Sequence, residues 1–136
     1  MQVVVSSTGD NLDAPVSPVF GRCMFFLFVD TETMDCRTVA NPATGASGGA
    51  GIQAAQFVTR EGAEAIVSGN LGPNAMRVIS TASVPFYSVM GGTAREAVEA
   101  LKAGALEPIS GPTVPADYGK GASGTGRGMG MGRRGY

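Results

Sequence analysis

Between residues 51 and 104 the chain alternates helical and strand patterns, and this alternation limits the fold more than any other feature of the sequence. Apolar residues recur at helical spacing in segments that begin near Gly51, Pro73 and Thr93, and the short apolar runs EAIVS and VPFYSV lie between them. Strands joined by helices pair in parallel through right-handed crossovers. The second half of the chain therefore predicts a parallel β-sheet covered by helices.

The first half of the chain adds strands of a different kind. The run QVVVSS is rich in β-branched residues and predicts a first strand, which is followed by a long loop over residues 7–22. Two further runs, at residues 24–30 and 36–40, flank the polar turn TETMD and predict a hairpin. A hairpin contributes one antiparallel strand to the sheet. The apolar faces of three helices indicate that helices cover both sides of that sheet. We therefore expect an α/β fold with a mixed five-stranded sheet and three helices.

Charge and glycine are distributed unevenly between the body of the chain and its C-terminal end. Residues 1–118 hold six Lys/Arg and eleven Asp/Glu, whereas residues 119–136 hold four Lys/Arg, no acid and eight glycines. A segment of that composition buries too little apolar surface to offset the entropy of ordering it. We expect an α/β domain over residues 1–109 and a disordered Gly/Met/Arg-rich tail over residues 110–136. Because no aromatic platform accompanies the basic tail, nucleic acid is not the favoured partner.

Composition excludes several other classes of protein. The chain has no histidine, which rules out imidazole metal ligands and a Ser/His/Asp triad. No apolar run approaches the roughly 20 residues of a membrane span, and the start MQVVVSS lacks a signal-peptide core. We expect a cytoplasmic monomer without membrane contact. The strand interiors also lack the carboxylate cluster that a two-metal nuclease needs.

Glycine-rich segments stand at the start of the predicted helices and indicate an anion site. Loops that leave the carboxyl ends of parallel strands gather on one edge of a sheet, and helix N-termini there present free N–H groups and a partial positive charge. Glycines allow an anion to reach the backbone, and an arginine in the preceding loop adds a fixed charge. Turn geometry alone is the competing explanation for these glycines. The candidate binding residues are Arg22, Gly48, Gly49, Gly51, Gly69, Asn70, Gly72, Asn74, Gly91, Gly92 and Thr93.

The segment GASGGAG does not predict a nucleotide site. No Lys-Ser/Thr follows it, as a Walker loop requires, and it lacks the βαβ spacing of the dinucleotide fingerprint. We therefore expect no nucleotide cofactor. A small phosphate-bearing metabolite remains an alternative ligand, since it would use the same helix N-termini.

Four motifs carry a resemblance to a known family. SPVFGR, GGAGIQAAQ, GNLGPNA and GGTAREAVEA resemble, in order and over residues 1–106, the motifs of the dinitrogenase iron–molybdenum cofactor biosynthesis family, in particular its short stand-alone, orange-protein-like branch. The resemblance implies a three-layer ribonuclease-H-like fold with sheet order 3-2-1-4-5 and strand 2 antiparallel. It also implies a non-enzymatic carrier of an anionic metal–sulfur cluster, of the molybdenum–copper sulfide or iron–molybdenum cofactor type, that delivers the cluster to protein partners. The alternative is a phosphate-metabolite or protein-interaction module without metal.

Two sulfur-bearing residues are candidate metal ligands. Cys23 adjoins the glycine-rich loops, and Met90 ends a predicted strand on the same edge, so that each offers a soft ligand. Each is also a plausible core residue. Cys36 is expected to be structural. If the hairpin turn pairs Asp30 with Asp35, Cys23 and Cys36 lie roughly 20 Å apart at ~3.3 Å per residue, so we expect two reduced thiols.

Overall fold

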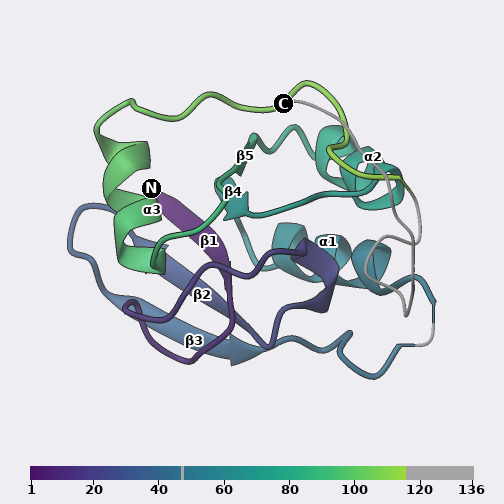
Figure 1. Ribbon diagram of the computed structural model, residues 1–136, viewed down its shortest axis with the longest axis horizontal. Coiled ribbons are helices and arrows are strands. Elements are labelled where there is room, and N and C mark those ends of the chain that lie inside the picture. The colour runs from purple at the N-terminus through teal and green to yellow at the C-terminus, as the bar shows by residue number, and fades with distance from the viewer. Residues whose placement is uncertain (47, 116–136) are drawn as a thin grey trace.

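A computed structural model describes residues 1–46 and 48–115, which form a three-layer α/β domain around one five-stranded sheet (Figure 1). The strands run in the order β3-β2-β1-β4-β5, with β1 antiparallel to β2 and parallel to β4. This confirms the predicted mixed sheet and its order. The strands are β1 (Gln2–Ser7), β2 (Phe25–Asp30), β3 (Cys36–Ala40), β4 (Ala65–Ser68) and β5 (Phe86–Ser88).

Three α-helices cover the two faces of this sheet, as Figure 1 shows. Strand residues alternate between the two faces, as the pleat requires: Val4 and Ile66 pack with α1 and α2, whereas Val5 and Val67 pack with α3. The alanines on the helix faces are buried and bring helices and sheet close together. The helices are α1 (Ala50–Arg60), α2 (Pro73–Thr81) and α3 (Ala94–Lys102), and a short 3₁₀ turn, η1 (Phe20–Arg22), precedes β2.

The hairpin of β2 and β3 has the predicted register. Val29 pairs with Cys36 and Phe25 with Ala40, which continues the pairing of residue 30 with residue 35. Both cysteines are free thiols, as expected, with Cys23 buried and Cys36 exposed. Because β3 is antiparallel to β2, it runs parallel to β1 and returns the chain to the edge at which β1, β4 and β5 end.

Residues 110–115, which we call the strap, follow the long connection that leads from α3 toward α2 (Figure 1). The N–H of Ile109 donates to the carbonyl of Phe86, and the N–H of Thr113 donates to the carbonyl of Leu71 at 2.8 Å. The composition of this segment predicted a tail from residue 110, yet the strap contacts the domain because its backbone finds partners there. The rest of the expected tail, residues 116–136, lies outside the described residues. Within residues 1–46 and 48–115, no helix is long and apolar enough to cross a membrane.

Candidate anion-binding cleft

A cleft of about 100 Å³ opens where η1, the start of α1, the start of α2 and the end of the strap meet. On a comparable measure a single water needs about 10–15 Å³, so the cleft has room for several ligand atoms. Six of the candidate residues line it, namely Arg22, Gly49, Gly51, Asn70, Gly72 and Asn74. Two of the predicted helix N-termini therefore come together at one site.

The N-terminus of α1 faces this cleft without a side-chain capping bond. Its N-cap, Gly49, has a φ of 72° and no side chain, and the first intrahelical bond runs from the N–H of Gln53 to the carbonyl of Gly49. Among the described residues, the N–H groups of Ala50, Gly51 and Ile52 find no acceptor. A helix end with unpaired donors and no acidic residue in its first turn favours an anion.

The N-terminus of α2 is open in the same way. Gly72 is its N-cap and Pro73 its first residue, so that one orphan N–H is replaced by a proline ring. The N–H of Met76 bonds to the carbonyl of Gly72, and the N–H groups of Asn74 and Ala75 have no acceptor in the described part of the chain. Since both helix ends line one cleft, their partial positive charges add there.

Close packing of small residues holds the two helix ends together. A Cβ on Gly51 would lie 3.3 Å from the Cβ of Ala75, so α1 and α2 approach each other at their first turns. Arg22, half-buried at the end of η1, adds a full positive charge to the same cleft. One Arg22 guanidinium nitrogen donates to the carbonyl of Ala46 at 3.2 Å, which holds the side chain beside the start of α1.

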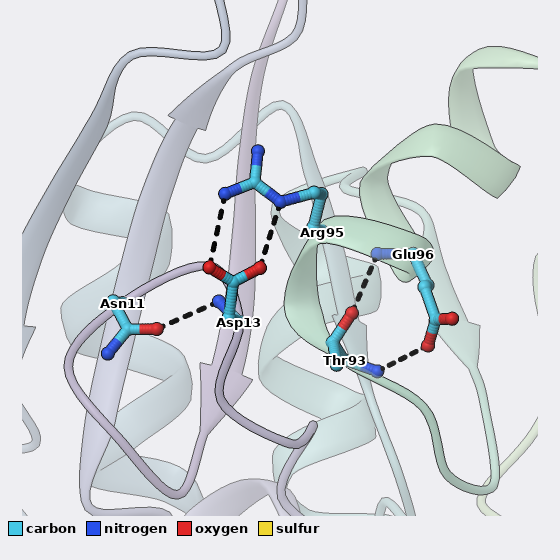
Figure 2. Close-up of polar contacts among 5 residues, drawn as sticks. All are labelled: Asn11, Asp13, Thr93, Arg95 and Glu96. Atoms are coloured by element: carbon cyan, nitrogen blue, oxygen red, sulfur yellow. Dashed lines mark hydrogen bonds and ion pairs between the residues drawn. The ribbon is translucent and has the colours of Figure 1, made fainter.

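The N-terminus of α3, by contrast, is closed by the protein itself. The N–H of Ala94 donates to the carbonyl of Ala14 at 2.9 Å, and the N–H of Arg95 donates to the carbonyl of Leu12 at 2.8 Å. Figure 2 shows that Thr93 and Glu96 form a capping box, in which each side chain accepts a bond from the backbone N–H of the other. The first-turn donors of α3 are thus occupied.

An ion pair ties the loop before β2 to α3 (Figure 2). The Arg95 guanidinium donates to the Asp13 carboxylate at 3.0 Å, and this hydrogen bond, together with the charge of Arg95, lowers the pKa of Asp13. Asn11 accepts the backbone N–H of Asp13 at 2.9 Å. The loop therefore lies over the α3 side of the edge, and Gly91, Gly92 and Thr93 are not among the residues that line the cleft.

Two other predicted glycines have different surroundings. Gly69 packs against Pro18, so closely that a Cβ would lie 2.5 Å from the Pro18 carbonyl oxygen, which makes this glycine a packing requirement. Its neighbour Asn70 exchanges backbone hydrogen bonds with Pro18 and Phe20 and fixes η1 against the end of β4. Gly48 is exposed just before α1 and does not line the cleft.

Neither candidate sulfur ligand lines the cleft. Cys23 is 1% exposed within the core cluster, and burial raises the pKa of its thiol to about 12, so the thiol is protonated at neutral pH. Met90 is 73% exposed and is neither a core residue nor part of the cleft lining. In the described part of the chain, no three His, Cys, Asp or Glu side chains gather where they would hold a metal ion. The cleft offers N–H donors and a guanidinium rather than side-chain metal ligands.

Sequence reasoning missed some residues of the cleft. Gly21 and the strap residues Val114 and Pro115 line it as well. The motif SPVFGR contains Gly21, so its glycine was a usable signal. Nothing in GPTVPAD distinguishes a docked strap from a linker, because its anchors are backbone groups and a single hydroxyl.

Comparison with known proteins identifies the family of this chain. The family model described as dinitrogenase iron-molybdenum cofactor matches residues 1–104, so the chain belongs to this family, which is linked to the metal-cluster cofactor of dinitrogenase.

Individual relatives narrow the comparison. The apo form of the orange protein from Desulfovibrio gigas superposes with a TM-score of 0.80 at 34% identity, covering 83% of this chain and 96% of that protein. A NifB-like protein of the DUF35 family from Thermotoga gives a TM-score of 0.72 at 33% identity, over 83% of this chain and 97% of that one. An uncharacterized protein of Methanocaldococcus jannaschii is 28% identical over 95 residues, which are 68% of this chain and 80% of that protein.

Proposed function

We propose that this protein is a non-enzymatic carrier that binds an anionic metal–sulfur cluster in the cleft between α1 and α2. The observation that carries the proposal is the convergence of two uncapped helix N-termini and Arg22 on one cleft. Family membership supports a metal–sulfur cluster as the class of anion, which the geometry alone leaves open. Within that class, we favour a molybdenum–copper sulfide cluster over an iron–molybdenum cofactor, because the chain has no histidine to offer as a metal ligand.

The donors of the cleft suit a cluster whose charge lies on sulfur. N–H groups of Ala50, Gly51 and Ile52 from α1, and of Asn74 and Ala75 from α2, can donate to sulfide without any metal–protein bond. Glycines at 49, 51 and 72 keep the backbone accessible. Among the described residues that line the cleft there is no Asp, Glu, Cys or Lys, so this lining contributes neither a repelling charge nor a nucleophile. These properties favour holding a preformed cluster over transforming it.

Arg22 supplies the attraction that the acidic body does not. Residues 1–118 carry more acidic than basic side chains, so the general field of the domain repels an anion. The guanidinium and the two helix ends produce a local field of the opposite sign. Neutralising Arg22 should therefore weaken cluster binding more than the loss of any single backbone donor would, and the protein should stay folded.

The experiment loads the apo-protein with tetrathiomolybdate and copper(I), and follows the visible absorption that elutes with the protein. We expect retained colour for the natural protein and at least about tenfold weaker binding for Arg22→Gln, since a hydrogen bond to a charged group contributes about 1.5–3 kcal/mol. Arg95→Gln, on the closed α3 side, is the matched control and should bind like the natural protein. If inorganic phosphate binds the cleft and tetrathiomolybdate with copper does not, the ligand is a phosphate-bearing metabolite and the carrier proposal is wrong.

A further inference from the structure

The strap forms one wall of the cleft although it lies far from the other walls in sequence. Val114 and Pro115 line the cleft, and the Pro115 carbonyl oxygen lies 3.7 Å from the position that a Cβ on Gly72 would take. The strap therefore lies beside the N-cap of α2, next to the N–H groups of that helix that have no acceptor among the described residues. The family model ends at residue 104, so this wall lies outside the region that the model matches.

Thr113 holds the strap in place through a double contact with Leu71. The N–H of Thr113 donates to the Leu71 carbonyl at 2.8 Å, and the N–H of Leu71 donates to the Thr113 hydroxyl, also at 2.8 Å. The hydroxyl in turn donates to the side-chain oxygen of Asn70 at 3.2 Å. Leu71 is 1% exposed, so without this hydroxyl its N–H would be a buried donor with no partner.

We propose that Thr113 is a positioning residue for cargo binding, and that it holds the strap as a retaining wall over the cluster. The inference rests on the proposed function and extends it to the release of the cargo. With the strap in place, Val114 and Pro115 exclude water from one side of the cleft, which strengthens the N–H contacts to an anion. A bound cluster leaves on this side only when the contact between Thr113 and Leu71 opens. The strap thus acts mainly on the rate of release.

The first test compares Thr113→Val with Thr113→Ser in the full-length protein. Valine has the shape of threonine without the hydroxyl, whereas serine keeps the hydroxyl and serves as the rescue variant. Each protein is loaded with tetrathiomolybdate and copper(I), and the loss of the visible band is followed after dilution. We expect release about 3–10 times faster from Thr113→Val, the size that the loss of one neutral hydrogen bond implies, and natural release from Thr113→Ser. Hydrogen exchange at the Leu71 amide reports whether the anchor has opened.

A second variant tests the wall without touching the anchor. Val114→Asp places a negative charge on the cleft lining, and Val114→Asn is its uncharged control. Val114→Asp should release the cluster faster and bind it more weakly than the natural protein does, with a larger effect at low salt. Val114→Asn should change the rate of release and the affinity much less.

The outcomes separate the two proposals. If the natural protein takes up no cluster, the proposed function fails and the retaining wall fails with it. The other case is that the natural protein binds the cluster, and that Thr113→Val and Val114→Asp both release it at the natural rate although the Leu71 amide of Thr113→Val exchanges faster. The retaining wall is then overturned, while the proposed function stands.

Discussion

The backbones of Gly21 and Gly51 are in direct contact. A Cβ on Gly21 would lie 2.8 Å from both the Cα and the N of Gly51, which is closer than real Cβ atoms approach other atoms. This contact packs η1 against the first turn of α1 and places Arg22, the next residue, at the mouth of the cleft. The glycine pair therefore sets the position of the charge that the proposed function requires.

Gly21→Ala should destabilise the domain, because the new methyl group meets backbone atoms that cannot rotate away. Overpacking of this kind costs about 1–3 kcal/mol of the free energy of unfolding, measured by urea denaturation. Gly45→Ala is the control, since a Cβ there meets nothing within 4 Å. Equal stability of Gly21→Ala and the natural protein would show that the contact between the two glycines is looser than described.

Gly72→Val should separate binding from folding. Gly72 has a φ of −84°, which any residue adopts, and its Cβ position meets only the Pro115 carbonyl, at 3.7 Å. A side chain there narrows the cleft and weakens cluster binding, while the loss of an N-cap glycine costs only about 1 kcal/mol of stability. Gly69→Ala is the contrasting variant, since its Cβ would meet Pro18, and it should lose stability first. Titration and urea denaturation of both variants measure the two effects, and undiminished binding by Gly72→Val would argue against ligand approach at this backbone.

Much of the fold could be predicted from the sequence because its determinants are local. The spacing of Ala54, Ala55 and Val58 specifies the buried face of α1, and the TETMD turn specifies the hairpin register. Thr93 and Glu96 form the capping box that their spacing predicts. Each of these signals lies within a short stretch of the chain, so no knowledge of tertiary packing was needed to interpret it.

The candidate site was harder to predict because it depends on which side of the sheet each helix covers. All the glycine-rich segments do reach one edge, but the loop before β2 crosses that edge and fills the α3 side with the backbone of Leu12 and Ala14. Gly91 and Gly92 precede a helix just as Gly72 does. The sequence cannot distinguish a helix N-terminus whose N–H groups are bonded by a distant loop from one whose N–H groups are available to a ligand. The anchoring of Thr113 to Leu71 is equally non-local.

Thr93→Ala should weaken the fold and leave cluster binding unchanged. The Thr93 hydroxyl accepts the N–H of Glu96 at 3.1 Å, and the loss of such a cap costs about 0.5–2 kcal/mol of the free energy of unfolding. Because the α3 N-terminus is already bonded to residues 12 and 14, it contributes no donor to the cargo. Thermal unfolding and cluster titration of this variant measure the two quantities, and a loss of cluster affinity in the folded variant would place the cargo at α3 instead.

The buried thiol of Cys23 should make stability fall at alkaline pH. Burial raises the pKa of this thiol in the folded protein from 9.0 to about 12. Above pH 9 the unfolded chain loses the proton more readily than the folded protein does, so the stabilisation that is complete below pH 9 is lost as the pH rises toward 12. Urea denaturation at pH 7 and pH 10 should show a smaller decrease for Cys23→Ala than for the natural protein. Identical decreases would mean that folding does not raise the pKa of the Cys23 thiol.

Mapping of the backbone amides during cluster binding tests the central claim most directly. In a titration of the ¹⁵N-labelled apo-protein with tetrathiomolybdate and copper(I), followed by NMR, the account predicts that the amide signals of Ala50, Gly51, Ile52, Asn74 and Ala75 shift together. The amides of Ala94 and Arg95, which are bonded to the loop before β2, should keep their positions. Shifts at Ala94 and Arg95, with silent amides at the starts of α1 and α2, would contradict the account.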